Sequence, residues 1–347
     1  MSIVKASYAS ARRQDDEPMI RFSIMQYCAA NLKLNAENIE TNSVIAIAWS
    51  KPKHIQRRAN PPRHRPDWKM IRKSFLWIPA LMAVMFRRTT TGREAVSVEG
   101  KVVIVTGAAR GIGQEYVRAL AAAGAHTIAA DVSDCSETVD LAASAGGKAL
   151  GIKCDVTDTA STDAMVHAAS KAFGRVDALI NNAALYGGLR GGRFETIAEA
   201  DWDAAMTVNV KGIWNCCKSA VPALRAAGGG SIINIASLAA TFGTPFVLHY
   251  TTSKAAVIGM TRGLARELGR DNIRVNAVAP SAVITEGTRE FFSNKLDKAL
   301  DVVKAGQAIQ RNLQPSDLSG TILWLVSDTS AFVTGQTIAV DGGTVMN

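Results

Sequence analysis

The stretch Lys101-Val-Val-Ile-Val-Thr106, followed directly by Gly107-Ala-Ala-Arg-Gly111-Ile-Gly113, decides the fold of this 347-residue chain. The apolar run after Lys101 indicates a strand that is buried on both faces. Glycine allows a tight turn and a close approach of the backbone to a ligand. A helix that begins near Ile112 would direct unpaired N–H groups at an anion. A strand, a glycine-rich turn and a helix in this order are typical of the first unit of a dinucleotide-binding sheet.

The same alternation of short apolar runs and alanine-rich helical stretches continues to the C-terminus. We expect strands over 101–106, 126–131, 149–154, 177–181, 231–236, 273–278 and 337–340. We expect helices from 112 onward and over 136–146, 160–173, 199–225, 250–268 and 316–327, with two short helices in 281–314. Right-handed crossovers place such strands in one parallel sheet. The sequence therefore predicts an α/β fold for residues 96–347: a single Rossmann-type, doubly wound parallel sheet of about seven strands with helices on both faces.

Residues 1–95 differ from the rest of the chain in charge and composition. They carry 17 Lys and Arg against 7 Asp and Glu, a net charge of +10, whereas residues 96–347 carry 22 against 23, a net charge of −1. Because the basic excess lies outside the predicted domain, the overall charge does not indicate a nucleic-acid partner. Breaker-rich basic stretches such as 51–66 rarely build a core. We expect residues 1–95 to be a poorly structured basic extension, disordered or artefactual, with Met82 or Met85 as a candidate true start.

An apolar run of twelve residues at 75–86 lies within this extension, between Arg72-Lys73 and Arg87-Arg88. It is too short to span a bilayer, which takes about 20 residues. A loose membrane-surface anchor and a targeting segment remain as alternatives to a disordered extension.

Cysteine and histidine patterns indicate neither a disulfide framework nor a metal site. The five cysteines contain no Cys-x-x-Cys pair, and the five histidines show no metal-binding spacing. Buried free thiols in a reducing compartment account better for the cysteines, so we expect a cytoplasmic protein without a bound metal.

Tyr250 and Lys254 lie four residues apart, and Ser237 precedes Tyr250 by thirteen residues. On a helix, residues with this spacing share a face. A phenol titrates near ~10, and an ammonium about 4 Å away stabilises the phenolate by on the order of 4 kcal/mol at an effective dielectric constant of ~20. The pair therefore predicts a tyrosine that acts as acid and base. The alternative is an ordinary pair on a helix surface.

Acidic residues follow the second and third predicted strands. Asp131 ends the second strand, where a carboxylate accepts hydrogen bonds from an adenosine ribose and repels a 2′-phosphate, which favours NAD over NADP. A turn or capping role beside Ser133 is the alternative, and Arg110 in the glycine loop could instead meet a phosphate. Asp155 and Val156 follow the third strand, where they could hold the adenine or be ordinary loop residues.

Asparagines mark the end of the fourth strand and the middle of a helix. Asn181-Asn-Ala-Ala184 lies at the edge of the sheet where open α/β folds bind ligands. Asn209 falls inside the predicted helix 199–225, where asparagine is a poor helix former. A functional role and an incidental one are both open for Asn209.

These motifs together resemble the short-chain dehydrogenase/reductase family over about residues 98–347. The resemblance rests on Thr106-Gly-x-x-x-Gly-x-Gly113, Asn181-Asn-Ala183, Asn209, Ser237, Tyr250-x-x-x-Lys254, Asn276-Ala-Val-Ala-Pro280 and the segment 334–343. Ala184 and Ser281 stand where the family usually has glycine, which bears on the shape of the nicotinamide end of the site. The Pro280-Ser281 variant and the Asp-Gly-Gly343 ending look like those of secondary-alcohol dehydrogenases such as 1-phenylethanol dehydrogenase.

The resemblance implies NAD(P)-dependent oxidation of secondary alcohols, or the reverse reduction of ketones, by a homotetramer. It implies that Tyr250 is the acid and base and that Lys254 lowers its pKa and holds the nicotinamide ribose. Ser237 would bind the substrate oxygen, and Asn209 would position a proton-relay water. The implied cofactor-binding residues are Gly107, Arg110, Gly111, Ile112, Gly113, Asp131, Asp155, Val156, Asn182, Tyr250, Lys254, Val283 and Thr285.

Our main prediction is an NAD-dependent dehydrogenase that acts on a small secondary alcohol or ketone. The loops 185–197 and 281–312 would hold the substrate, and Phe291-Phe292 would form an apolar lid that favours an apolar or aromatic alcohol. Two alternatives remain. The first is an NADP-linked reductase of the 3-oxoacyl-carrier-protein type, for which Arg110 would bind the extra phosphate. The second is a non-catalytic dinucleotide-binding scaffold.

A shortened chain that begins at Met85 is expected to keep the full activity of the 347-residue chain, because all the predicted chemistry lies in residues 96–347. The measurement is kcat/KM for NAD-dependent oxidation of a panel of secondary alcohols by both chains. A shortened chain that fails to fold would show that the extension belongs to the folded unit.

Overall fold

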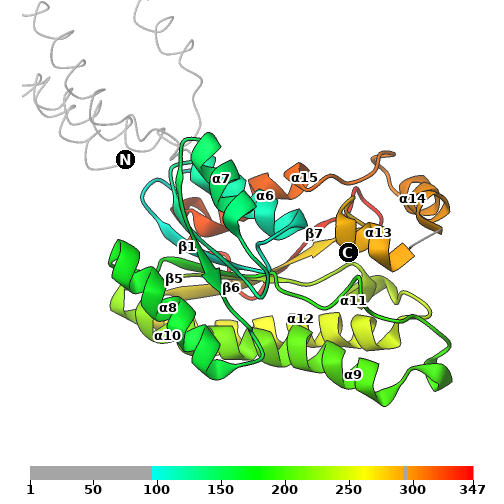
Figure 1. Ribbon diagram of the computed structural model, residues 1–347. Helices are drawn as coiled ribbons and strands as arrows, with labels where there is room; N and C mark the ends of the chain where they lie inside the picture. The colour runs from blue at the N-terminus through cyan, green and yellow to red at the C-terminus, as the bar shows by residue number, and fades with distance from the viewer. Residues whose placement is uncertain (1–95, 293–294, 347) are drawn as a thin grey trace, which may run out of the picture. The chain divides into compact units, whose positions relative to one another are not determined.

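A computed structural model describes residues 96–292 and 295–346 of the chain (Figure 1). The predicted extension 1–95, its apolar run at 75–86 and Cys28 lie outside the described residues. In the part that is described, no helix combines the length and the apolar character that crossing a bilayer requires.

The described residues form one sheet of seven strands in the order β3-β2-β1-β4-β5-β6-β7, and every neighbouring pair is parallel. The strands are β1 (Val102–Thr106), β2 (His126–Asp131), β3 (Lys148–Lys153), β4 (Ala178–Asn181), β5 (Gly230–Ile235), β6 (Ile273–Pro280) and β7 (Thr337–Val340). The predicted fold class is thereby confirmed. The order of the strands reverses between β1 and β4, and this is the point at which open α/β sheets bind ligands.

Helices cover both faces of the sheet, which explains why β1 and β4 are buried along their whole length (Figure 1). One face is covered by α6 (Gly111–Ala122), α7 (Ser136–Ser144) and α15 (Ser316–Val326). The other face is covered by α8 (Thr159–Phe173), α10 (Gly212–Ala226) and α12 (Leu248–Leu268). Uninterrupted apolar runs such as 102–105 are what a strand needs when both its faces are buried.

The long helix predicted over 199–225 is interrupted. It consists of α9 (Glu199–Met206), a π-helical turn η2 (Thr207–Lys211) and α10. The backbone N–H of Gly212 donates to the carbonyl of Thr207, five residues earlier, so the turn is wider than an α-helical one. Such widened turns are frequent at functional sites. Apolar periodicity does not distinguish them from a continuous helix, which is why the sequence prediction missed this one.

The smaller elements lie mostly in the loops after the strands. The two short helices expected in 281–314 are α13 (Glu286–Phe292) and α14 (Leu296–Ala305). A four-residue helix, α11 (Ala239–Phe242), was not predicted. The 3₁₀ turns are η1 (Phe194–Thr196), η3 (Gly269–Asp271) and η5 (Asp328–Ser330).

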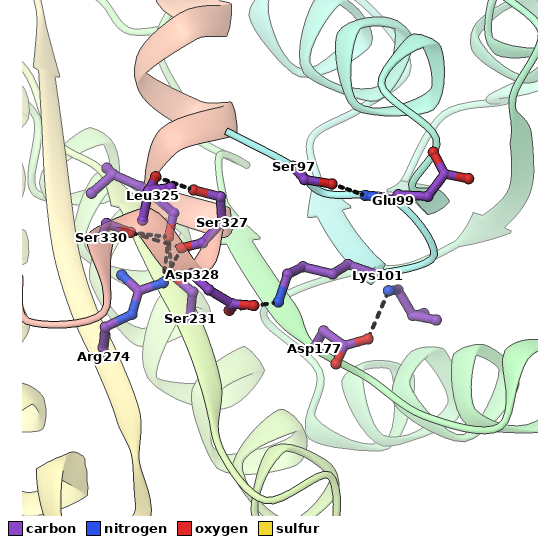
Figure 2. Close-up of polar contacts among 12 residues, drawn as sticks. Ser97, Glu99, Lys101, Asp177, Ser231, Arg274, Leu325, Ser327, Asp328 and Ser330 are labelled. Carbon is purple, nitrogen blue, oxygen red and sulfur yellow. Dashed lines mark hydrogen bonds and ion pairs between the residues drawn. The ribbon is translucent and has the colours of Figure 1, made fainter. Parts of the chain in front are cut away.

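The C-terminal end of α15 is tied to the neighbouring strands β5 and β6 by charged and hydroxyl side chains (Figure 2). The guanidinium of Arg274 donates to the carbonyls of Leu325, at 2.7 Å, and Ser327, at 3.3 Å. The hydroxyls of Ser231 and Ser330 also donate to the carbonyl of Leu325. A cation at the C-terminus of a helix meets the negative end of its dipole. These bonds hold α15 against the sheet.

Replacing Arg274 with methionine should lower the free energy of unfolding by roughly 1.5–3 kcal/mol, because the helix carbonyls lose a charged donor. Urea denaturation measures the loss. The matched control is Lys101→Met, which removes a 2.8 Å ion pair with the exposed Asp328 at the same corner. An exposed pair contributes about 0–1 kcal/mol. Equal losses in the two variants would contradict the stronger role assigned to Arg274.

Candidate active site

The ends of β1 and β4 are joined by the hydroxyl of Thr106. This hydroxyl donates to the carbonyl of Ile180 at 3.3 Å and accepts from the backbone N–H groups of Asn182 and Ala183, both at 3.1 Å. Thr106 is almost fully buried. Its role was missed in the sequence, although a hydroxyl at the end of an apolar strand was a usable signal. The bonds hold the two strand ends together at the switch point of the sheet.

Two glycines of the loop after β1, Gly107 and Gly113, lie too close to neighbouring backbone to accept a side chain. Gly107 has a φ of +64°, and a Cβ there would lie 2.6 Å from the Cα of Ala183. A Cβ on Gly113 would overlap the carbonyl oxygen of Gly107. The side-chain amide of Asn182 donates to the carbonyls of Thr106, at 3.0 Å, and Gly107, at 2.9 Å. The predicted residue Asn182 therefore braces the loop from β4.

Helix α6 begins at Gly111 with N–H groups that no side chain caps. Arg110 is the N-cap residue and makes no side-chain hydrogen bond to the first turn, which also contains no acidic residue. Thr285 lies beside the loop, because a Cβ built on Gly111 would be 3.7 Å from its side chain. The turn contains the predicted residues Gly111, Ile112 and Gly113. An uncapped helix start behind a glycine turn fits the pyrophosphate of a dinucleotide.

The carboxylate of Asp131 bonds to the glycine loop and to its own turn. One oxygen accepts from the N–H of Ala109 at 3.0 Å, and the other accepts from the N–H of Ser133 at 2.9 Å. The turn role that the sequence left open is therefore real. The bond from Ala109 places the negative charge of Asp131 next to the glycine loop, where the ribose of an adenosine would lie.

Asp155 and Val156 occupy the loop after β3. The carboxylate of Asp155 accepts from the backbone N–H and the hydroxyl of Thr157, at 2.8 and 2.7 Å. Val156 is buried, and a Cβ on Gly212 would lie 2.7 Å from its Cγ2 atom. Asp155 thus stabilises its own loop, which was one of the two roles that the sequence left open.

Val283 and Thr285 lie in the segment between β6 and α13. Val283 is buried, forms a backbone bridge with Leu313 and accepts a 2.6 Å bond at its carbonyl from the hydroxyl of Thr288. The hydroxyl of Thr285 accepts from the N–H of Thr288 at 3.2 Å. These bonds fix the start of α13 beside the glycine loop.

Tyr250 and Lys254 lie one turn apart near the start of α12, as their spacing predicts. The ammonium of Lys254 is buried and donates to the carbonyl of Ile235 at 2.8 Å. Its nitrogen lies 5.7 Å from the centre of the Tyr250 ring. Burial lowers the pKa of Lys254 to about 8. Ser237 follows β5 and hydrogen-bonds to Tyr250.

The pKa of the Tyr250 phenol differs from the sequence-based expectation. Burial raises this pKa to about 12, and the hydrogen bond from Ser237 offsets part of the increase. The expected lowering assumed an ammonium about 4 Å from the phenol. Lys254 instead directs its ammonium to the carbonyl of Ile235. The expectation that the pKa of Tyr250 is lowered was therefore wrong where only the protein's own side chains and backbone act on the phenol.

Asn209 lies in the π-helical turn, with its side chain fully buried. Its amide oxygen accepts from the N–H of Leu185 at 2.7 Å, and its amide nitrogen donates to the carbonyl of Leu185 at 3.2 Å. The nitrogen also donates to the hydroxyl of Ser253 at 3.1 Å, and that hydroxyl donates to the carbonyl of Tyr250 at 2.8 Å. Asn209 therefore connects the loop after β4 to helix α12. Ser253 was missed in the sequence.

An aromatic stack extends from Tyr250 to α13. The ring of Tyr186 lies 5.1 Å from that of Tyr250 and stacks on that of Phe291 at 4.5 Å, and Phe291 meets Phe292 edge to face at 5.0 Å. The predicted lid residues are thus joined to the phenol ring of Tyr250 through Tyr186. Sequence reasoning placed this tyrosine in the substrate loop 185–197 but did not single out its ring. An aromatic residue within a glycine-rich mouth was the available signal.

The guanidinium of Arg110 points to α13, where it bonds to Glu290 at 2.6 and 3.0 Å and to Glu286 at 3.5 Å.

Cys135, Cys154, Cys216 and Cys217 are free and buried. Within 96–292 and 295–346, no three His, Cys, Asp or Glu residues gather into a cluster that could hold a metal ion.

The chain is similar to known enzymes over almost all of the described domain. A sequence profile described as enoyl-(acyl carrier protein) reductase matches residues 107–345. The 3-oxoacyl-[acyl-carrier-protein] reductase FabG of Thermotoga maritima is 38% identical over 250 residues, which cover 72% of this chain and 99% of that protein.

Solved structures of dehydrogenases also match this chain over the described domain. The carveol dehydrogenase from Mycobacterium avium, in complex with NAD, matches with a TM-score of 0.66 and 31% identity, covering 71% of this chain and 98% of that one. A putative NAD(P)-dependent gluconate 5-dehydrogenase from Beutenbergia cavernae, with bound NADP at low occupancy, matches with a TM-score of 0.67 and 34% identity, covering 72% and 98%. This chain is an NAD(P)-dependent oxidoreductase and belongs to the short-chain dehydrogenase/reductase family.

Proposed function

We propose that this enzyme transfers a hydride between NAD(H) and the carbon of a secondary alcohol or ketone, with Tyr250 as acid and base. The observation that carries the proposal is the arrangement of Ser237, Tyr250 and Lys254 at the carboxyl edge of the sheet. This edge also holds the uncapped start of α6 and the carboxylate of Asp131. The groups needed for proton transfer and for dinucleotide binding therefore converge on one crevice.

In the oxidative direction, Tyr250 takes the proton of the substrate hydroxyl, and Ser237 donates a hydrogen bond to the same oxygen. A bound nicotinamide supplies the hydride acceptor, and its positive charge favours the phenolate. The charge of the nicotinamide matters because burial by itself raises the pKa of Tyr250 to about 12. In the reductive direction, Tyr250 returns the proton to the oxygen.

Lys254 and Asn209 support the phenol from the protein side. The buried ammonium of Lys254 is held by the carbonyl of Ile235, which leaves its other protons for a ribose or a water. The side chain of Asn209 is bonded to Leu185 and Ser253. A relay water would therefore be positioned by the backbone of the π-helical turn rather than by this amide.

Asp131 supports NAD rather than NADP as the cofactor. Its carboxylate is held against the glycine loop by the N–H of Ala109 at 3.0 Å. A carboxylate in this position accepts ribose hydrogen bonds and repels a 2′-phosphate. The related structures include an NAD complex and an NADP complex, so the choice rests on this residue.

The substrate proposed is an apolar or aromatic secondary alcohol, because the wall next to Tyr250 is made of aromatic rings. Tyr186 and Phe291 form that wall. The second candidate is an NADP-linked reduction of a 3-oxoacyl group, which is the activity in the name of the 38%-identical Thermotoga maritima protein.

We further propose that residues 96–347 form the dehydrogenase domain of a cytoplasmic homotetramer and that residues 1–95 lie outside its catalytic unit. The tetramer rests on the family. Large apolar side chains such as Trp214 and Leu248, at 48% and 42% exposure, would be covered by neighbouring subunits in such an assembly.

Tyr250→Phe should lower kcat by about 10²–10⁴-fold, because it removes the acid and base while keeping the ring. NADH affinity should stay close to that of the native enzyme, since the phenol contributes little to it. The measurements are steady-state turnover of a secondary alcohol and fluorescence titration with NADH.

The matched control for this substitution is Tyr116→Phe. The Tyr116 hydroxyl is buried and has no hydrogen-bond partner among the described residues, so its loss should leave turnover unchanged. Native turnover in Tyr250→Phe would refute the proposed mechanism.

The native enzyme should bind NADH at least about tenfold more tightly than NADPH, because Asp131 meets the 2′-phosphate with a like charge. Asp131→Asn should narrow this difference. Asp134→Asn is the control, because Asp134 is exposed in the same turn and its carboxylate bonds to Ser136 rather than to the glycine loop. Tighter NADPH binding by the native enzyme would overturn the proposed cofactor.

A further inference from the structure

Arg110 is the one residue of the glycine loop 107–113 with a charged side chain. It directly follows Ala109, whose N–H holds the carboxylate of Asp131. A guanidinium at this place suits a phosphate, and an arginine near the ribose is how dinucleotide folds accommodate the 2′-phosphate of NADP. The position of Arg110 thus favours NADP, whereas Asp131 favours NAD.

The guanidinium of Arg110 is occupied by two carboxylates of α13. Two of its nitrogens donate to the two oxygens of Glu290, at 2.6 and 3.0 Å, and one also reaches Glu286 at 3.5 Å. Such a paired, fork-like geometry is the strongest form of an arginine–carboxylate contact. Glu290 in turn raises the pKa of Arg110, and Arg110 lowers the pKa of the Glu290 carboxyl.

The backbone around the ion pair brings the two partners together. Thr285, which directly precedes α13, lies against Gly111, the residue after Arg110. On the far side, a Cβ on Gly187 would overlap the carboxylate of Glu290, so the loop after β4 makes room for that carboxylate. The pair therefore joins two elements that the fold already holds in contact, which reduces the entropy lost in forming it.

We propose that Glu286 and Glu290 are specificity-determining residues: they keep Arg110 away from a 2′-phosphate, so that Asp131 decides for NAD. The inference rests on the proposed dinucleotide site. The guanidinium and the three carboxylates near this end of the loop carry a net charge of −2. An NADP phosphate would have to displace Glu290 from Arg110 and would then face all three carboxylates. A ribose hydroxyl meets neither cost.

The test is a cycle of variants in which Kd is measured for NADH and for NADPH by fluorescence titration of the full-length protein. Replacing both carboxylates, Glu286→Gln with Glu290→Gln, should tighten NADPH binding relative to NADH by about fivefold, the factor for losing one well-formed exposed ion pair. In the native background, where Glu290 already holds the guanidinium, Arg110→Met should change the ratio of the two Kd values much less than in the double-glutamine background. The same substitution should abolish the gain in the double-glutamine background.

The control for a general change of charge is Asp271→Asn. This substitution breaks the ion pair between Asp271, in η3, and Arg225, in α10. Because η3 precedes the amino end of β6, at the opposite edge of the sheet, the substitution should not alter the ratio of the two Kd values.

Three outcomes would overturn the inference. The first is a loss of NADPH affinity on Arg110→Met in the native background that is as large as the loss in the double-glutamine background, since Arg110 would then already serve the phosphate. The second is an unchanged Kd ratio in the double-glutamine variant. The third is an equal gain for NADH and NADPH, which would assign the released guanidinium to the pyrophosphate. Failure of the proposed function would differ from all three, because the native enzyme would then bind neither dinucleotide or would prefer NADPH.

Discussion

The close approach of the β1 and β4 ends is the constraint on which the rest of the site depends. Thr106 bonds across it to Ile180, Asn182 and Ala183, and Asn182 returns two bonds to the glycine loop. The distance is short enough that a Cβ at Gly107 would collide with the opposite backbone. The strand order reverses at this point, and the uncapped start of α6 lies at the same edge of the sheet. The other groups of the site are arranged around that opening.

Helix α12, which carries Tyr250 and Lys254, is connected to this opening through a buried polar network. Asn209 bonds both backbone groups of Leu185, in the loop after β4, and reaches α12 through Ser253. Lys254 adds a bond from α12 to β5. Buried polar groups are costly when they lack partners, so a network in which each bond joins two elements also fixes their relative positions. The π-helical turn belongs to this network, because it carries the buried Asn209.

Helix α13 contacts both halves of the site with different chemistry. Phe291 stacks on Tyr186 beside Tyr250, and Glu290 binds Arg110 beside the glycine loop. In the proposed function, the aromatic contact favours an apolar substrate, and the ion pair changes the charge that a dinucleotide would meet. This helix of seven residues would therefore take part in selecting both the substrate and the cofactor.

The sequence by itself determined the parallel sheet, the glycine turn and the Tyr250–Lys254 spacing, because buried strands, tight turns and helix faces are encoded by residues near one another in the chain. Only the tertiary structure decided where the longer side chains point. It turned Arg110 toward α13, stacked Tyr186 on Phe291 and directed Lys254 to the carbonyl of Ile235. It also widened one turn around Asn209. These outcomes depend on partners that are distant in sequence and on burial, and the periodicity of a sequence carries information about neither.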